Sequence, residues 1–367
     1  MARVIAFYLP QFHPILENDK WWGKGFTEWT NVAKARSLFR GHYQPRIPAD
    51  LGFYDLRLSD VREAQAQMAY EAGVEGFCYW HYWFGNEKRL LERPFDEVLN
   101  SGKPDFPFCF GWANHSWYNK TWDLKGKDTL LIEQKYLGTE DYTKHFYDVL
   151  LPAFKDHRYI LVDGKPLFVI FQPLDSPEIE VIISTWRKLA IDNGLGGIYF
   201  VGKCSGENKS EVLKIGFDAV YRQQILNIHI RQSVLKKMLL FAKVKIFNCP
   251  RIYSYKEAIK YMYDEEDLKE DTIPTIVPNF DHTPRSGVRG YVFVDSSPEL
   301  FFSQVKKAYS LVKDRFSIPD FPGFPNIYRP ESKAAIICSL SRYMQTLILF
   351  CKLFNISIKL GSNTSFV

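Results

Sequence analysis

The chain has 367 residues, of which 46% are hydrophobic and 24% are charged, and its formal net charge is +5. This size allows one α/β barrel with long loops or about two average domains, and the composition allows a sizeable core. Lys and Arg are scattered, which argues against nucleic-acid binding. We find no signal peptide and no uncharged apolar run of about 18 residues, so we expect a cytoplasmic protein with at most peripheral membrane contact.

Seven short runs rich in β-branched and aromatic residues predict β-strands. They lie at residues 4–9, 74–80, 106–112, 167–171, 198–201, 218–221 and 275–278. Stretches with helical patterns lie between or after several of these runs, at residues 60–73, 140–154, 179–193, 255–263 and 298–314. Continuous apolar strands that alternate with helices indicate a parallel sheet covered on both faces.

These elements favour an α/β fold with a TIM-like (β/α)8 barrel over an open nucleotide-binding sheet. The first strand leads into Pro10 and a long loop, and no glycine-rich phosphate turn follows any predicted strand. In a barrel, the residues that follow each strand converge at one face, which carries active sites. Residues far apart in the sequence are therefore expected around one cleft.

Cysteines and acidic residues give no metal-binding pattern. The six cysteines are far apart, and Cys78 and Cys109 lie inside predicted strands, which indicates reduced, buried thiols. The acidic run at residues 264–267 could suggest the metal site of a nucleotide-sugar transferase, but its charged, helical context favours a solvated surface. A basic and apolar stretch predicts a surface helix whose lysine stems cover apolar neighbours. Its lysines are Lys236, Lys237, Lys243 and Lys245.

Aromatic residues make up 16% of the chain and gather where predicted strands end. Residues 77–84 hold six of them in eight positions, including Tyr82 and Trp83. Such rings either fill a core or stack on a ligand while their polar edges stay wet. We expect at least one of Tyr82 and Trp83 to stack on a sugar.

A second cluster follows the third strand, at residues 112–117. Asn114 offers both a donor and an acceptor, which suits a sugar diol. His115 is a base, a hydrogen-bonding group or a loop histidine without a special role. The sequence leaves these three alternatives open.

Chemistry at a glycosidic bond needs two carboxylates, one to donate a proton and one to act as base or nucleophile. Glu28 lies in a loop rich in Gly and Trp, at residues 21–32, that is expected to fold over the barrel mouth. Asp281 follows the seventh predicted strand. We take Glu28 and Asp281 as catalytic candidates, although a carboxylate bonded to loop amides is an equal alternative for Glu28.

Several segments closely resemble the WbsX family. They are residues 6–13, 25–32, 76–84, 90–94, 112–114 and 278–285. Proteins of this family are associated with bacterial O-antigen and capsule polysaccharide clusters and are usually labelled glycosyltransferases. Their domain resembles the (β/α)8 barrel of endo-α-mannosidase glycoside hydrolases. The resemblance implies a barrel domain at residues 1–313 that acts on glycosidic bonds of an oligosaccharide or lipid-linked glycan, with no cofactor and no metal.

From the aromatic and polar residues in and after the predicted strands and in the loop at residues 21–32, we also expect a set of glycan-contacting residues. They are Tyr8, Trp29, His81, Tyr82, Trp83, Trp112, Asn114, His115, Trp117 and Asn279.

Two departures from the family affect the expected chemistry. The family usually reads W-A-N-E-N-W where this chain has His115 at the fourth position. Its last strand usually reads close to N-A-W-N-E-W-x-E-G, and in the related mannosidases these two acids are the general base and the general acid of a retaining mechanism in which the substrate's 2-hydroxyl attacks. No such motif occurs here. The last strand region is therefore expected to be diverged or truncated.

Residues 314–367 are an atypical tail that is Pro-rich and then cationic, without an acid after Glu331. This shift indicates an altered reading frame or a replaced C-terminus, or else a diverged eighth strand at residues 334–339. Two other functions stay open. One is a glycosyltransferase that uses a nucleotide sugar, and the other is a catalytically inactive glycan-binding barrel.

Overall fold

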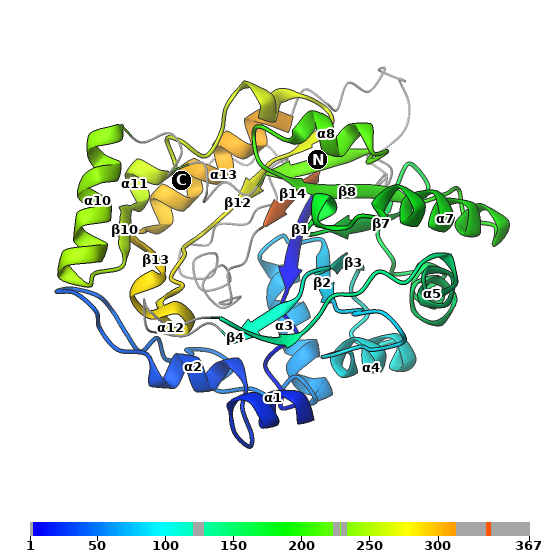
Figure 1. Ribbon diagram of the computed structural model, residues 1–367, viewed down its shortest axis with the longest axis horizontal. Coiled ribbons are helices and arrows are strands. Elements are labelled where there is room, and N and C mark those ends of the chain that lie inside the picture. Colours follow the sequence, from blue (N-terminus) through cyan, green and yellow to red (C-terminus); the bar gives the residue numbers. More distant parts are fainter. Residues whose placement is uncertain (1–2, 120–127, 223–227, 229–232, 313–334, 339–367) are drawn as a thin grey trace, which may run out of the picture.

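The structure is a computed structural model that describes residues 3–119, 128–222, 228, 233–312 and 335–338. Parallel strands form a central sheet that is surrounded by helices (Figure 1). The strands of this sheet are β1 (Arg3–Tyr8), β2 (Gly76–His81), β3 (Phe108–Trp112), β7 (Lys165–Ile170), β8 (Tyr199–Cys204), β9 (Ala219–Arg222), β11 (Thr272–Ile273), β12 (Thr275–Ile276) and β14 (Ala335–Cys338). The short β6 (Leu161–Val162) joins β7 in an antiparallel pair.

The order of the strands closes a ring. It runs β11-β9-β8-β7-β3-β2-β1-β14-β12, and only Pro274 separates β11 from β12 in the chain. Proline has no N–H and cannot continue a ladder, so one strand is split into a half that pairs with β9 and a half that pairs with β14. Counting β11 and β12 as one strand gives eight parallel positions, and the predicted (β/α)8 barrel is confirmed.

The eighth position is taken by β14, which pairs in parallel with β1 and β12. Ala335 lies opposite Arg3 and Cys338 opposite Ala6. A strand within residues 334–339 is therefore confirmed. Residues 313–334 and 339–367 lie outside the described residues, so the structure does not test the expectation of an atypical tail.

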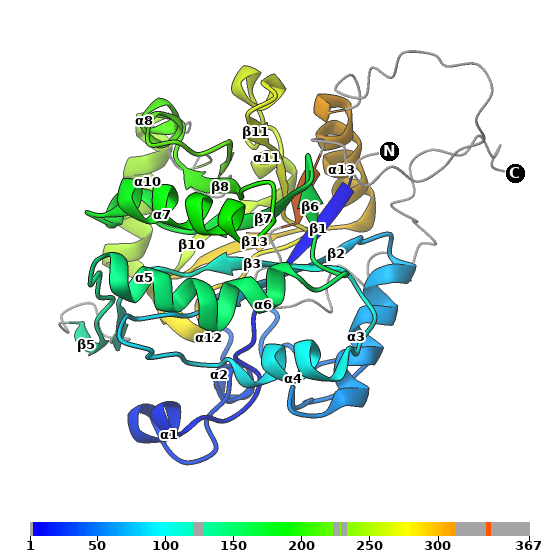
Figure 2. The same cartoon turned by 90° about the vertical axis from the view of Figure 1, so that its right-hand side faces the viewer.

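Helices cover the outside of the sheet (Figure 2). Three of the helical predictions agree closely with the structure, at α3 (Ser59–Glu71), α7 (Ile179–Asp192) and α13 (Pro298–Val312). The prediction at residues 140–154 corresponds to three consecutive segments, α5 (Thr139–His145), the π-helical turn η1 (Phe146–Leu150) and α6 (Leu151–Phe154). Further helices that lie around the barrel are α4 (Arg93–Ser101) and α8 (Lys209–Lys214).

Two local predictions are wrong. The helix expected at residues 255–263 ends early, since α11 covers only Tyr255–Ala258, and Tyr263 is instead buried with its hydroxyl donating to the carbonyl of Thr275 at 2.8 Å. The acidic run at residues 264–267 is not a solvated helical surface. Asp267 is fully buried and accepts a hydrogen bond from Arg222 at 2.9 Å.

The inside of the barrel is filled by aromatic and small residues. Cys78 and Cys109 lie opposite each other on β2 and β3, and both are buried free thiols, as predicted. A Cβ on Gly111 would lie 3.0 Å from the ring of Trp80. Gly111 therefore makes room for an indole at the inner side of the sheet, where Trp80 stacks on Phe7 with ring centroids 4.6 Å apart.

Smaller elements lie around the sheet. They are α1 (Leu16–Trp22), α2 (Glu28–Lys34), α12 (Thr283–Ser286), the 3-10 turns η2 (Pro173–Asp175), η3 (Glu265–Leu268) and η4 (Gly287–Arg289), the hairpin of β4 (Trp117–Asn119) and β5 (Thr129–Ile132), the parallel pair β10 (Arg251–Ser254) and β13 (Tyr291–Val294), and α10 (Val234–Phe247). α2 contacts α12, so the loop after β1 meets the loop after β12 (Figure 1).

Candidate functional site

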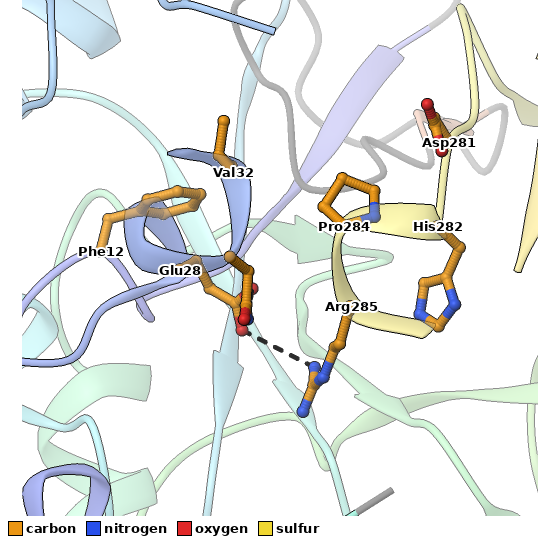
Figure 3. Close-up of a pocket in the computed structure, with 8 residues that line it drawn as sticks. Phe12, Glu28, Val32, Asp281, His282, Pro284 and Arg285 are labelled. Carbon is orange, nitrogen blue, oxygen red and sulfur yellow. Dashed lines mark hydrogen bonds and ion pairs between the residues drawn. The ribbon is translucent and has the colours of Figure 1, made fainter. Parts of the chain in front are cut away.

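A small pocket, partly open to solvent, lies where these two loops meet (Figure 3). It is lined by Phe12, Glu28, Asn31, Val32, Asp281, His282, Pro284 and Arg285. The structure thus brings together the two carboxylates that we selected as catalytic candidates, although they are far apart in the sequence.

Glu28 is held at the start of α2 by the sequence around it. Thr27 caps the helix, because its hydroxyl accepts from the backbone N–H of Trp29 at 3.2 Å. The N–H of Glu28 donates to the carbonyl of Gln11 at 3.2 Å, which ties the helix to the loop after β1. This places a carboxylate that is only 5% exposed at the wall of the pocket.

The carboxylate of Glu28 has polar neighbours on both sides. It accepts from Asn31 Nδ2 at 3.3 Å and lies 3.7 Å from Nη1 of Arg285. Figure 3 shows Arg285 reaching from α12 toward Glu28, with Asp281 on the far side of Pro284. These contacts are longer than those of a tightly bonded ion pair, and a substrate hydroxyl or leaving-group oxygen could replace either one.

Asp281 is bound much more tightly. Its Oδ1 accepts from the N–H and hydroxyl of Thr283 at 2.9 and 2.6 Å, and its Oδ2 accepts from His42 and Gln44 at 2.9 and 2.6 Å. The N–H of Leu38 donates to Nδ1 of His42, so Nε2 is the nitrogen that carries the hydrogen toward Asp281.

Burial acts to raise the pKa of Asp281, but the hydrogen bonds from His42, Thr283 and Gln44 outweigh it and hold the pKa below its usual value. Asp281 is therefore a stable anion, which is a poor proton donor. Its bonds join the loops at residues 36–46 and 279–284 beside the pocket.

A row of contacts leads from Glu28 to an aromatic surface. Gln11 donates to the hydroxyl of Tyr82 at 3.4 Å, and Tyr82 packs edge-on against Trp117 with centroids 5.1 Å apart. Trp117 also contacts Trp21, whose ring centroid is 6.1 Å away. Trp21 and Trp117 are half-buried while Tyr82 is buried, so the two indoles are the accessible part of this row.

Burial raises the pKa of the Tyr82 hydroxyl well above its usual value, with smaller opposing contributions from Arg285 and the Gln11 hydrogen bond. Tyr82 therefore stays neutral and is a hydrogen-bonding group near Glu28.

The residues after β2 form a separate, buried cluster. Nε2 of His81 lies 2.7 Å from Nε2 of His145, and the ring of His145 stacks on Trp83 with centroids 4.3 Å apart. Trp83 donates to Asp141 at 3.1 Å and is 2% exposed. Burial lowers the pKa of both histidines well below the usual value, so one neutral ring donates to the other.

Trp112 and Asn114 are also bound within the protein. Trp112 is 1% exposed and donates to the carbonyl of Trp83 at 3.1 Å. Asn114 is fully buried, where its Nδ2 donates to the carbonyl of Gln172 at 2.8 Å and its Oδ1 accepts from the N–H of Gln172 at 2.8 Å. Asn114 thus joins the ends of β3 and β7.

The remaining predicted glycan contacts are spread over the mouth and the outer layer. Tyr8 turns toward α3 and donates to Gln65 at 2.7 Å. Trp29 donates to the carbonyl of Tyr54 at 2.8 Å, and His115 is half-buried against Phe171 with ring centroids 5.2 Å apart. The half-buried Asn279 accepts from the N–H of Phe280 at 2.7 Å.

Four residues at the mouth were not selected from the sequence. Gln11, His42 and Arg285 act through partners that are distant along the chain, which a local pattern does not reveal. Lys203 is the second-last residue of β8, and its place two positions after the predicted strand at residues 198–201 could have indicated it.

Comparisons with known proteins agree with this description. The sequence profile described as Glycosyltransferase WbsX matches residues 4–320. A curated relative, the uncharacterized protein WxcX of Xanthomonas campestris pv. campestris (strain B100), is 36% identical over 304 residues. The match covers 82% of this chain and 42% of the relative, and the same protein from a second strain matches equally. The chain spans about two fifths of the length of these relatives.

Solved structures of similar fold are carbohydrate-related by title. A protein titled glycoside hydrolase-like has a TM-score of 0.58 at 16% identity, with 97% of this chain and 94% of that chain covered. A GH99 endo-alpha-mannosidase from Bacteroides thetaiotaomicron, solved with bis-tris-propane, has a TM-score of 0.52 at 13% identity, with 93% and 84% covered. At these identities the likeness shows the fold.

Proposed function

This chain belongs to the WbsX glycosyltransferase family, and we propose that it acts on glycosidic bonds during the synthesis of a bacterial polysaccharide such as O-antigen or capsule. Its substrate is an oligosaccharide or a lipid-linked glycan that lies across the barrel mouth. The observation that carries this proposal is the pocket lined by Glu28, Asp281 and Arg285, which Gln11 and Tyr82 connect to the half-buried indoles of Trp21 and Trp117.

Glu28 and Asp281 have different roles in this proposal. Glu28 lies at the pocket wall with contacts of 3.3 Å to Asn31 and 3.7 Å to Arg285, where a sugar hydroxyl or a glycosidic oxygen can replace one of them and exchange a proton with the carboxylate. Asp281 keeps its hydrogen bonds and its negative charge. It fixes the pocket wall and stabilises positive charge that develops on the sugar ring in the transition state.

A glycan-binding barrel without turnover is the second candidate function. It is favoured by β14, which supplies Ala, Ile, Ile and Cys where the family's strand usually carries its acids, and by the full set of hydrogen bonds on Asp281. Transfer from a nucleotide sugar is a third possibility, which predicts affinity for the nucleotide.

Titration calorimetry and product analysis separate these functions. The probes are a panel of mannan-type oligosaccharides and a panel of nucleotide sugars with and without a divalent metal, and the proteins are wild type and Glu28→Gln. The proposal predicts oligosaccharide binding by both proteins and turnover by wild type alone. Binding without turnover in wild type supports the second candidate, and tight binding of a nucleotide sugar alone contradicts the proposal.

We further propose that the protein works in the cytoplasm and touches the membrane only at its surface. No helix in the described part of the chain is long and apolar enough to cross a bilayer. α10 is a surface helix as predicted, and it exposes Val234 and Phe241 at 72% and 64%. It carries four lysines and no acid, which suits an anionic lipid surface. Equal binding of Phe241→Glu and wild type to vesicles rich in phosphatidylglycerol would contradict this contact.

We also propose that residues 1–313 are the family domain and residues 314–367 a replaced C-terminus, part of which serves as β14. Sequencing the DNA beyond codon 313 tests the version that invokes a shifted frame. That version predicts N-E-W-x-E-G in another frame, and its absence from all frames overturns it.

A further inference from the structure

Lys203 occupies an unusual position for a cation. It is the fifth of six residues in β8. A Cβ on its neighbour Gly202 would lie 2.7 Å from Val212 and 3.1 Å from Phe217, so Gly202 faces the outer layer. Because side chains alternate along a strand, Lys203 points to the inside of the barrel, close to its carboxyl end.

The surroundings of Lys203 are aromatic. Its Nζ lies 3.8 Å from the centroid of the Phe171 ring. Phe171 contacts Trp80 edge-on at 5.4 Å between centroids and also contacts His115. Lys203 is half-buried, and burial lowers its pKa to about 8, an effect that the more distant Asp175 partly opposes.

Several buried cations of this barrel, unlike the half-buried Lys203, are paired with carboxylates. Arg3 lies 2.6 Å from Glu75, Arg158 2.7 Å from Asp156, Lys209 2.5 Å from Asp271 and Arg222 2.5 Å from Asp264. Within residues 3–119, 128–222, 228 and 233–312, Nζ of Lys203 has neither a hydrogen bond nor a carboxylate within 4.0 Å.

Taking a cation out of water costs free energy unless an opposite charge or strong hydrogen bonds replace the water. The ring of Phe171 offsets part of that cost by cation–π attraction. An anionic group of a ligand in the barrel mouth would offset the remaining cost by pairing with Nζ of Lys203. That group would lie against Phe171 and Trp80, aromatic rings of the kind on which a sugar packs.

We propose that Lys203 binds an oxyanion of the substrate, either the carboxylate of an acidic sugar or the phosphate of the group to which the glycan is linked. This inference rests on the proposed glycan-binding function and specifies the charge of the substrate. The substrate is an anionic glycan whose negative group lies beside Phe171.

Titration calorimetry with three probes tests this subsite. The probes are a neutral mannan-type oligosaccharide, an oligosaccharide of the same length that ends in a uronic acid, and inorganic pyrophosphate. The variants are Lys203→Met, which keeps the length of the side chain but removes the charge, and Lys203→Arg, which keeps the charge. Lys188→Met is the control, because Lys188 is an exposed lysine on α7, paired with Asp192, and its loss changes the net charge equally.

We expect Lys203→Met to weaken at least ten-fold the binding of the uronic acid probe or of pyrophosphate, and to leave the neutral probe unchanged. Lys203→Arg should retain most of the affinity, and Lys188→Met should match wild type. The probe that responds identifies the source of the oxyanion.

The two proposals fail in different ways. If wild type binds the neutral probe as tightly as both anionic probes, or if Lys203→Met weakens all three equally, the anion subsite is wrong and the glycan-binding function stands. If only pyrophosphate binds and Lys203→Met abolishes that binding, the subsite stands and the glycan-binding function is wrong. If no probe binds to wild type, both are wrong.

Discussion

The two sides of the barrel mouth use similar residues in opposite ways. After β2 and β3, the aromatic and polar side chains of Trp83, Trp112 and Asn114 are bonded to one another and to the backbone, with almost no exposure. After β1 and β12, Glu28 and Arg285 face a pocket across 3.7 Å. Dense aromatic sequence therefore marks the wall that supports the mouth, while sparser loops provide the charged groups that line the pocket.

Replacing Glu28 by Gln should have the largest effect on activity. The change keeps the shape and the bond from Asn31 but removes the group that moves a proton, so turnover should fall about 10²- to 10⁴-fold. Thermal unfolding should change little. Asp281→Asn is the informative comparison, because it should mainly reduce stability. An equal loss of turnover in both variants, with unchanged stability, would show that they act as a symmetric pair.

Replacing Trp83 by Ala tests whether the wall is structural. It removes a ring that stacks on His145 and a hydrogen bond to Asp141, which should cost about 3–5 kcal/mol of unfolding free energy in urea titrations. A variant that unfolds like wild type but no longer binds glycan would reverse our assignment of the two sides.

The loop after β1 should make the protein sensitive to acid through His13. Burial lowers the pKa of His13 to about 4, below its unfolded value of about 6.5, so folding favours the neutral ring. The unfolded chain therefore binds a proton at higher pH than the folded chain does, and the free energy of unfolding decreases as the pH falls. Between pH 7 and pH 5 the loss from this group should be about 2 kcal/mol. Unfolding of wild type and His13→Gln at both pH values measures it, and an equal loss in the two proteins rules His13 out.

Replacing Trp117 by Ala should give the smallest change in stability and a clear change in binding. Its ring is half-buried against Tyr82 and Trp21, so stability should fall by about 1 kcal/mol and glycan affinity by roughly ten-fold, since one stacking contact is lost. Calorimetry measures the glycan affinity of Trp117→Ala beside that of Trp83→Ala and so compares the two sides of the mouth. Unaltered affinity would place the sugar away from this indole.

The barrel could be predicted from the sequence because buried parallel strands are local apolar runs. β14 was the difficult strand, since its four residues follow a long Pro-rich stretch and its place is fixed only by pairing with β1 and β12. Glu28 and Asp281 could be found from strand ends and from resemblance. The full set of hydrogen bonds on Asp281 could not be predicted, because two of the four come from His42 and Gln44, more than 200 positions away.

A crystal structure of the Glu28→Gln protein with a bound oligosaccharide tests the central claim most directly. The account predicts a sugar in the pocket between α2 and α12, with a hydroxyl or glycosidic oxygen within hydrogen-bonding distance of residue 28 and a ring near Trp117. A sugar bound in the cluster of His81 and Trp83, or anywhere that leaves this pocket empty, would contradict it.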